Sequence, residues 1–380
     1  MNDNTIENEV LSLASIFAEM TDKRKPKGVR YQFQILLILL SLAKLCYQDT
    51  ASEIAEWVLN RSDLLKDKLE LEWKRMPSQS TWQRLLGQNI DSAEFDERVG
   101  EYFQSLSSTE KQLYNLDGKV LCGTIAKETD KQLHLLALQE AETNAVMEQT
   151  ALEAGENEIS AAKRLLEKAN LVNKIVSGDA MFAQQELSHT IGEKGGQYLW
   201  KLRANQGKMY QLAVAHFEKL DDKYLGQARS LEKGHGRIDE REILSSFRIV
   251  GSLEFPYLEQ VFRITRRSEE VKTGKVSKQM IYGITSLSVE EFSAQDLLAL
   301  TRKHWGIENG LHYRRDVTFK EDAIRQTDFN GGRVQAILNN LTIGILRKLG
   351  WENIAQARRY FSSQIDEALN LILNPISLLL

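Results

Sequence analysis

The chain has 380 residues, 42% of them hydrophobic and 27% charged, and a formal net charge of −4 at pH 7. The length fits two or three folding units, and the composition is usual for a globular protein. The longest apolar run, residues 33–43, is too short to span a bilayer, which takes about 20 residues. Two cysteines provide neither a disulfide framework nor a zinc-binding spacing. The sequence therefore predicts a cytoplasmic protein with no membrane partner.

The slightly acidic balance does not by itself indicate a nucleic-acid-binding protein, because phosphate binding usually needs a basic surface. The charge is uneven, however: residues 263–278 hold six Lys or Arg and two Glu. A second basic stretch contains Lys23, Arg24, Lys25 and Lys27. A solvated face is the ordinary interpretation of such runs. If the protein binds DNA, these two stretches are where its affinity is expected.

The first hundred residues are predicted to be helical. Apolar residues recur at helical spacing in 5–20, 29–47 and 50–65, and Thr50 or Ser52 can cap the third of these helices. This pattern predicts a helical N-terminal domain over about residues 1–108.

The stretch 76–90, "MPSQSTWQRLLGQNI", places a proline and two serines ahead of a short helical pattern. Two short helices around such a break are consistent with plain packing helices. They are also consistent with a helix-turn-helix in which Thr81, Trp82 and Arg84 face DNA.

The pattern changes near residue 111, from helical spacing to alternation, and the second domain is predicted over 109–380. The predicted elements are strands at 112–124, 131–142 and 145–153, a helix at 157–170, a strand at 171–181, a helix at 183–196, a strand at 197–204 and a helix at 206–220. Residues 224–287 are β-rich, and helix returns from 293 onward. Within the first strand, Asp117-Gly118 is predicted to form a turn.

Three antiparallel strands followed by helix, strand and helix are typical of an RNase H-like sheet, in which the first and fourth strands lie side by side. A carboxylate on each of these strands, Asp117 and Asp179, would then meet. A late helix packed on the sheet could add Glu308. Mg²⁺ prefers oxygen ligands of this kind, and two such ions about 4 Å apart can drive an in-line phosphoryl displacement. The alternatives for each residue alone are a turn for Asp117 and a structural ion pair for Glu308.

Several motifs together resemble bacterial insertion-sequence transposases of the DDE class, in the branch of the H-repeat-associated proteins. They are "LDGKVLCGT", "GDAMFAQQE", "KLRANQ", "GHGRIDER", "HWGIENGLHYRRDVTFKED" and "LNNLTIGILRK", in this order, with "KPKGVRY", "EIAEW" and "PSQSTWQRL" in the N-terminal part. The resemblance covers nearly the whole chain. It implies an RNase H-like fold with a β-rich insertion at about 224–287, and catalytic, metal-binding roles for Asp117, Asp179 and Glu308. It also implies two Mg²⁺ ions, which Mn²⁺ can replace, and a homodimer on paired DNA ends.

The chain departs from related transposases at some positions. Their third acidic residue lies in a Tyr-Arg-Glu-Lys signature, and at the matching spacings this chain has Thr301, His304, Glu308 and Arg315. Cys122 stands where an arginine is usual. Asp316, Glu321 and Asp322 are alternatives to Glu308 as the third metal ligand. If Glu308 is the ligand, Asp316 is expected to stabilise the metal-binding residues without binding the metal itself.

Polar and cationic side chains around these motifs are candidates for DNA contact, since arginine's planar fork suits phosphate. The candidates are Arg84, Lys201, Asn205, Gln206, His235, Arg237, Arg266, Arg267, Arg302, Lys303, His304, Arg314 and Arg315. Trp305, among them in sequence, is expected to be core.

Three functions follow as hypotheses. The first is a Mg²⁺-dependent transposase that binds the double-stranded inverted repeats of its element, hydrolyses a phosphodiester and joins the 3′-hydroxyl to target DNA. The second is a catalytically weak, transposase-derived DNA-binding or regulatory protein, which the loss of the arginine at Cys122 favours. The third is a nuclease-like protein acting on RNA or single-stranded DNA.

Overall fold

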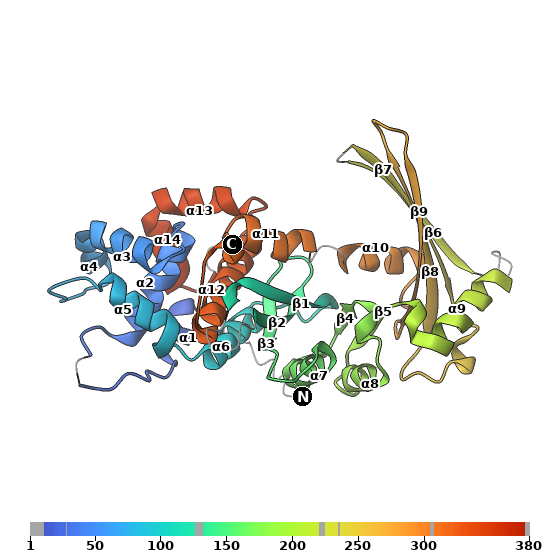
Figure 1. Cartoon of the computed structure of the whole chain (residues 1–380), viewed down its shortest axis with the longest axis horizontal. Helices are drawn as coiled ribbons and strands as arrows, with labels where there is room; N and C mark the ends of the chain where they lie inside the picture. The colour runs from blue at the N-terminus through green and yellow to red at the C-terminus, as the bar shows by residue number, and fades with distance from the viewer. Residues whose placement is uncertain are drawn as a thin grey trace, which may run out of the picture.

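A computed structural model describes residues 11–27, 29–125, 132–219, 225–234, 236–304 and 308–376, without the side chains of Ser252, Glu308 and Asn309. His235 and Trp305 therefore lie outside the described residues. One mixed sheet runs through the molecule (Figure 1), with helices of both chain ends gathered beside β1–β3 and a long β-ribbon at the other end. Within the described residues, no helix combines the length and apolar character needed to cross a membrane.

The nine strands form one sheet in the order β3-β2-β1-β4-β5-β9-β8-β7-β6. Their bounds are β1 Gln112–Ile125, β2 Gln132–Glu140, β3 Val146–Ala151, β4 Lys174–Gly178, β5 Gln197–Leu202, β6 Gly226–Gly234, β7 Arg237–Ser246, β8 Gln260–Glu270 and β9 Val276–Thr285. Strands β1, β2 and β3 are antiparallel neighbours, whereas β4 pairs in parallel with β1, and β5 with β4. This half of the sheet confirms the predicted RNase H-like topology.

The predicted β-rich insertion is confirmed as four antiparallel strands that extend the same sheet, because β9 pairs with β5. Strand β6 is the one member that the sequence pattern does not single out. Its residues alternate between exposed and half-buried positions, and Leu231 is 73% exposed. An edge strand of this kind buries no apolar face. Its sequence therefore does not alternate between apolar and polar residues, which is the pattern from which strands are predicted.

Helices surround the sheet in two groups. Their bounds are α1 Leu13–Ala18, α2 Phe33–Leu45, α3 Ala51–Asn60, α4 Ser62–Lys68, α5 Gln79–Arg84, α6 Ser92–Ser105, α7 Glu158–Lys168, α8 Gln185–Glu193, α9 Gly207–Lys219, α10 Ala294–His304, α11 Tyr313–Val317, α12 Phe329–Lys348, α13 Ile354–Ser363 and α14 Ile365–Leu373. A π-turn, η1 (Leu85–Asn89), follows α5, and a second, η6 (Glu308–His312), precedes α11. The predicted caps Thr50 and Asn157 both accept backbone hydrogen bonds at their helix starts.

The N-terminal helices share one apolar core with the C-terminal helices. Helix α2 is buried along nearly its whole length, and it packs against α12, α13 and α14. The apolar side chains of α1–α6 and α12–α14 belong to a single cluster, which also reaches the sheet. The boundary expected near residue 108 lies between α6 and β1. Independent folding of residues 1–108 stays a prediction.

A buried group of charges lies where these two sets of helices meet. Arg358 of α13 is fully buried, donates to the backbone oxygen of Lys44 at 3.1 and 2.9 Å, and pairs with Asp49 at 2.8 Å. Lys44 of α2 also pairs with Asp49, at 2.7 Å. The ring of Phe319 packs against both cations, 4.3 Å from the Arg358 guanidinium and 5.2 Å from the Lys44 ammonium. Asp49 is thus the carboxylate that compensates two buried cations.

Replacing Asp49 with Asn should destabilise the protein. The amide keeps the shape but leaves Lys44 and Arg358 buried without a compensating charge, a loss of about 3–5 kcal/mol. The free energy of unfolding is measured by denaturant titration. The control is Asp366→Asn, which removes the partner of Lys68 in an exposed pair and should leave the unfolding midpoint unchanged. Equal midpoints for the Asp49 variant and the wild type would contradict this role.

Candidate catalytic site

Asp117 and Asp179 lie at equivalent positions on neighbouring parallel strands. The pairing of β1 with β4 ends at Leu116 and Gly178, and the two aspartates come next on their strands. Neighbouring strands lie about 4.8 Å apart, and residues in register point to the same face. The side chains are 29% and 43% exposed, respectively. The two carboxylates therefore lie side by side and open to solvent where the pairing of β1 with β4 ends.

The turn predicted at Asp117-Gly118 is wrong. Strand β1 continues through both residues, with Asp117 opposite Ala137 and Gly118 opposite Leu136 on β2. The glycine is needed for another reason. A Cβ at Gly118 would lie 2.6 Å from a carboxylate oxygen of Glu158 and 3.0 Å from the ring of His134. These two side chains pair at 2.7 Å over the strand.

Glu308 begins η6, and a histidine on either side of it in the sequence lies near one of the two aspartates. The imidazole Nε2 of His304 lies 3.7 Å from Asp179 Oδ1, and Nδ1 of His312 lies 3.7 Å from Asp117 Oδ2. Glu308 is four residues from each histidine. Residues 305–307 and the Glu308 side chain are outside the described part, so convergence of all three carboxylates stays a proposal.

A chain of buried hydrogen bonds orients His304. The Ser177 hydroxyl donates to Asn115 Oδ1 at 2.7 Å and lies 2.9 Å from His304 Nδ1. Because the single hydroxyl proton goes to Asn115, the serine oxygen accepts the Nδ1 proton, and Nε2 faces Asp179. Sequence reasoning missed both polar residues. Each stands two positions before one of the two aspartates, at a buried strand position where apolar side chains are usual, and that spacing is the signal.

Cations surround Asp179. Lys201 Nζ lies 3.0 Å from Asp179 Oδ1 and an Arg203 nitrogen 3.7 Å from Oδ2. The contact with His304, together with the charge of Lys201, holds the pKa of the Asp179 carboxyl well below its usual range. Burial lowers the pKa of His312 to about 3, with Arg315 and Lys119 adding to the effect. His312 is thus neutral near pH 7 and does not form an ion pair with Asp117.

A pocket of about 620 Å³ opens beside Asp179, between the end of β5 and the insertion strand β9. Lys201 and Asn205, both expected near the site, line it together with Arg203. Gln206 instead donates its side-chain amide to the backbone oxygen of Ala180 at 2.7 Å.

Several cations expected to contact DNA are already paired with carboxylates. On the insertion, Arg266 bonds Asp239 and Arg267 bonds Glu269 at 2.8 Å. The partners on α10 are Glu232 for Arg302 and Glu142 for Lys303. Arg314 donates to the backbone oxygens of Gly310 and Glu352, while Arg84 and Arg237 are exposed at the end of α5 and the start of β7.

Burial contradicts two expected DNA contacts. Arg315 is 1% exposed and pairs with Glu321 at 2.8 Å, so its guanidinium does not reach a surface phosphate. His304 is 6% exposed, and its ring lies 2.9 Å from the Ser177 hydroxyl. Trp82, which the helix-turn-helix alternative placed facing DNA, is fully buried and fills the core between helices, so its side chain does not face DNA.

The rivals to Glu308 have other partners. Glu321 is buried with Arg315 and accepts from Asn339 at 2.8 Å. Asp316 pairs with Lys119 of β1 at 2.6 Å, so it contacts the strand that carries Asp117. Asp322 accepts from the backbone N–H of Cys122 at 3.0 Å.

Two hard, partly exposed carboxylates on neighbouring strands suit a divalent cation such as Mg²⁺. Among the side chains that the structure describes, no group of three or more His, Cys, Asp and Glu could hold a metal ion. The side chain of Glu308, the expected third ligand, is not among those described.

The sheet order, the parallel β1–β4 pair and the aspartates that follow it place this chain among the RNase H-like folds. The model of the family described as Transposase DDE domain matches residues 121–345, and that described as DDE_Tnp_1-associated matches residues 14–103. The chain belongs to the DDE transposase family, in its H-repeat branch. Domains of this family generally use divalent metal ions.

Named relatives resemble the chain over nearly its full length. "Putative transposase YncI" of Escherichia coli O157:H7 is 26% identical over 348 residues, which cover 89% of this chain and 88% of that protein. "H repeat-associated putative transposase YhhI" of Escherichia coli strain K12 is 24% identical over 355 residues, covering 89% of this chain and 91% of that protein.

Replacing His304 with Gln should raise the pKa of Asp179 towards its ordinary value, because the largest favourable interaction of the carboxylate is removed. An NMR titration that follows the side-chain carboxyl carbons of labelled aspartates measures this pKa directly. His312→Gln is the matched control, since His312 faces Asp117, and it should leave Asp179 unchanged. An unaltered Asp179 titration in the His304→Gln variant would remove His304 from this role.

Proposed function

We propose that the protein is a metal-dependent DNA transposase of an insertion sequence. It binds the ends of its element, hydrolyses a phosphodiester at each end and joins the freed 3′-hydroxyl to a phosphate of target DNA, whose own 3′-oxygen leaves. The observation that carries the proposal is that Asp117 and Asp179 directly follow the last paired residues of β1 and β4, with His312 and His304 beside them. A homodimer on paired ends is part of the same proposal.

In this mechanism Asp117, Asp179 and Glu308 would hold Mg²⁺, or Mn²⁺ in its place, and the bound metal would activate the attacking oxygen and stabilise the leaving oxygen. The chain's own cations prepare the site. Lys201 neutralises Asp179 and lines the pocket beside it, where its ammonium group can contact a DNA phosphate. His304, held by Ser177, keeps the Asp179 carboxylate oriented.

A second candidate function is a DNA-binding protein with weak catalysis. The observation that favours it is Cys122, exposed on β1 near the end of the strand that carries Asp117, where the family resemblance leads us to expect an arginine. Cleavage activity separates the two candidates, because only the first requires it.

Asp117→Asn, Asp179→Asn and Glu308→Gln should each abolish cleavage of a supercoiled plasmid that carries the element's ends, and should leave binding of the ends largely intact. The amides keep the shape and remove the charge that holds the metal. Gel analysis of nicked and linear plasmid, with Mg²⁺ present, measures the first effect, and gel shift without metal measures the second.

Asp322→Asn is the matched control, because this carboxylate caps the N–H of Cys122 outside the proposed triad, and cleavage should persist. Full cleavage by any one of the three amide variants would exclude that residue from the mechanism.

A further inference from the structure

A second polar groove lies in the N-terminal helical region, away from the catalytic site. Its volume is about 710 Å³, and its walls come from residues 23–31, 75–78 and 81–89. Seven of the fifteen lining residues are Lys or Arg, and none of the described lining residues is Asp or Glu. This concentration of positive charge occurs in a chain whose net charge is −4.

Most of these cations have no carboxylate partner. Lys23 pairs with Asp91, and Arg24 with Asp22. Within the described residues, the other five form no ion pair, and all of them are exposed: Lys25, Lys27, Arg30, Arg75 and Arg84. By contrast, Arg266 of the insertion pairs with Asp239, and Arg302 of α10 pairs with Glu232. The groove therefore presents a cluster of cations that carboxylates of the described residues do not compensate.

The positions of these five cations indicate which kind of ligand the groove can bind. Five such cations from separate segments of the chain suit an extended polyanion better than a single small phosphate, which needs one enclosed cradle. Contacts of lysine and arginine with phosphates carry no base information, and Trp82, the large aromatic side chain of α5, is buried. Contacts of this kind position a duplex without specifying its sequence.

We propose that this N-terminal basic groove binds the sugar-phosphate backbone of duplex DNA irrespective of sequence, at a distance from the cleaved bond. The inference rests on the proposed function and assigns it a second DNA surface. In Figure 1, α5 lies at one end of the molecule and the β-insertion at the other, with β1 and β4 between them. A duplex that reaches both surfaces follows the long axis of the protein, so the groove holds DNA beyond the catalytic aspartates.

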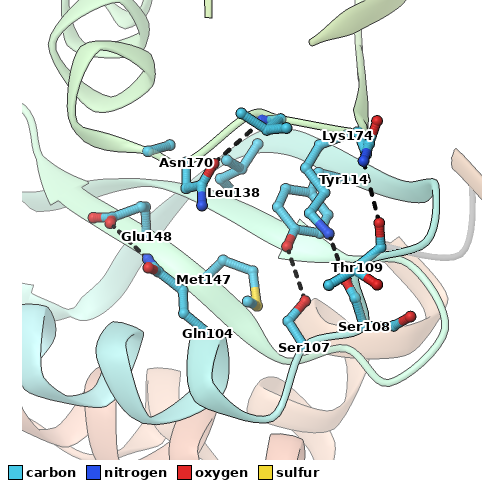
Figure 2. A pocket seen from close by; sticks show the side chains of 13 residues that line it. Gln104, Ser107, Ser108, Thr109, Tyr114, Leu138, Met147, Glu148, Asn170 and Lys174 are labelled. Atoms are coloured by element: carbon cyan, nitrogen blue, oxygen red, sulfur yellow. Dashed lines mark hydrogen bonds between the residues drawn. The ribbon is translucent and has the colours of Figure 1, made fainter. Parts of the chain in front are cut away.

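The pocket at the start of β1 and β4, shown in Figure 2, is a weaker candidate site. Its volume is about 180 Å³, and its polar groups are already bonded to one another: Tyr114 to Ser107, Gln104 to Glu148, and Lys174 to the backbone oxygen of Ser108.

The test measures binding of short labelled duplexes to the full chain without divalent metal, by fluorescence anisotropy at several salt concentrations. The groove variant is Lys25→Gln with Arg75→Gln and Arg84→Gln. It should bind at least about tenfold more weakly near 0.1 M salt, and its salt slope should fall by about 0.9 log units for each phosphate that the variant no longer neutralises. Duplexes with the element's ends and with random sequence should lose affinity equally.

Two comparators make the result specific. Arg359→Gln removes an exposed arginine on α13 and should bind as the wild type does. Arg266→Gln with Arg267→Gln should reduce affinity less than the groove variant, because both side chains are already paired. Thermal unfolding confirms that the variants fold, since every altered side chain in the groove variant is at the surface.

Unchanged affinity and slope in the folded groove variant would overturn the proposal, as would a loss confined to the element's ends. Tighter binding of RNA or of acidic lipid vesicles than of duplex would overturn the choice of partner. The proposed function fails separately: it fails if the wild type neither binds duplex nor cleaves plasmid. If the groove variant binds and cleaves normally, the proposed function stands, and only the proposed role of the groove is contradicted.

Discussion

The parallel pairing of β1 with β4 is the contact on which the candidate site depends. It brings Asp117 and Asp179, which are 62 residues apart in the chain, to neighbouring positions just beyond the paired part of β1 and β4. A slip of one residue would turn one carboxylate to the opposite face. The polar pair Asn115 and Ser177, two residues upstream, is also brought together by this register. The register therefore sets both the carboxylates and the support beneath them.

Charge compensation holds the rest of the site in place. The carboxylate of Asp179 is balanced by Lys201 and His304, and the segment that follows Glu308 is anchored by the buried pair of Arg315 and Glu321. Further along that segment, Phe319 packs between buried cations of α2 and α13. The N-terminal helices thus contact the same stretch of chain that carries the proposed third ligand, because both ends of the chain share one core.

The distribution of charge also separates the surfaces that could take DNA. The basic run at 263–278 is the most prominent one in the sequence, and two of its arginines, Arg266 and Arg267, pair with carboxylates of the same β-ribbon. The cations at 23–30 are less numerous, but the fold adds Arg75 and Arg84 to them and leaves five without an acidic partner among the described residues. Which cations of a charged run are compensated is a tertiary property, because the pairing runs across strands and between segments.

The sequence alone determined the order of strands and helices, the insertion and the two aspartates, because periodicity and strand-end carboxylates are local patterns. The family motifs added Glu308, whose role stays a prediction. Tertiary structure decided the outcomes that depend on neighbours distant in the chain. Arg315 and Trp82 look like surface residues in their local motifs, and burial against Glu321 and the helical core made them structural. Gly118 looks like a turn residue, and the crossing pair of His134 and Glu158 made it a point of close approach within a continuous strand. Each of these outcomes depends on a contact with a residue that the local sequence pattern does not predict.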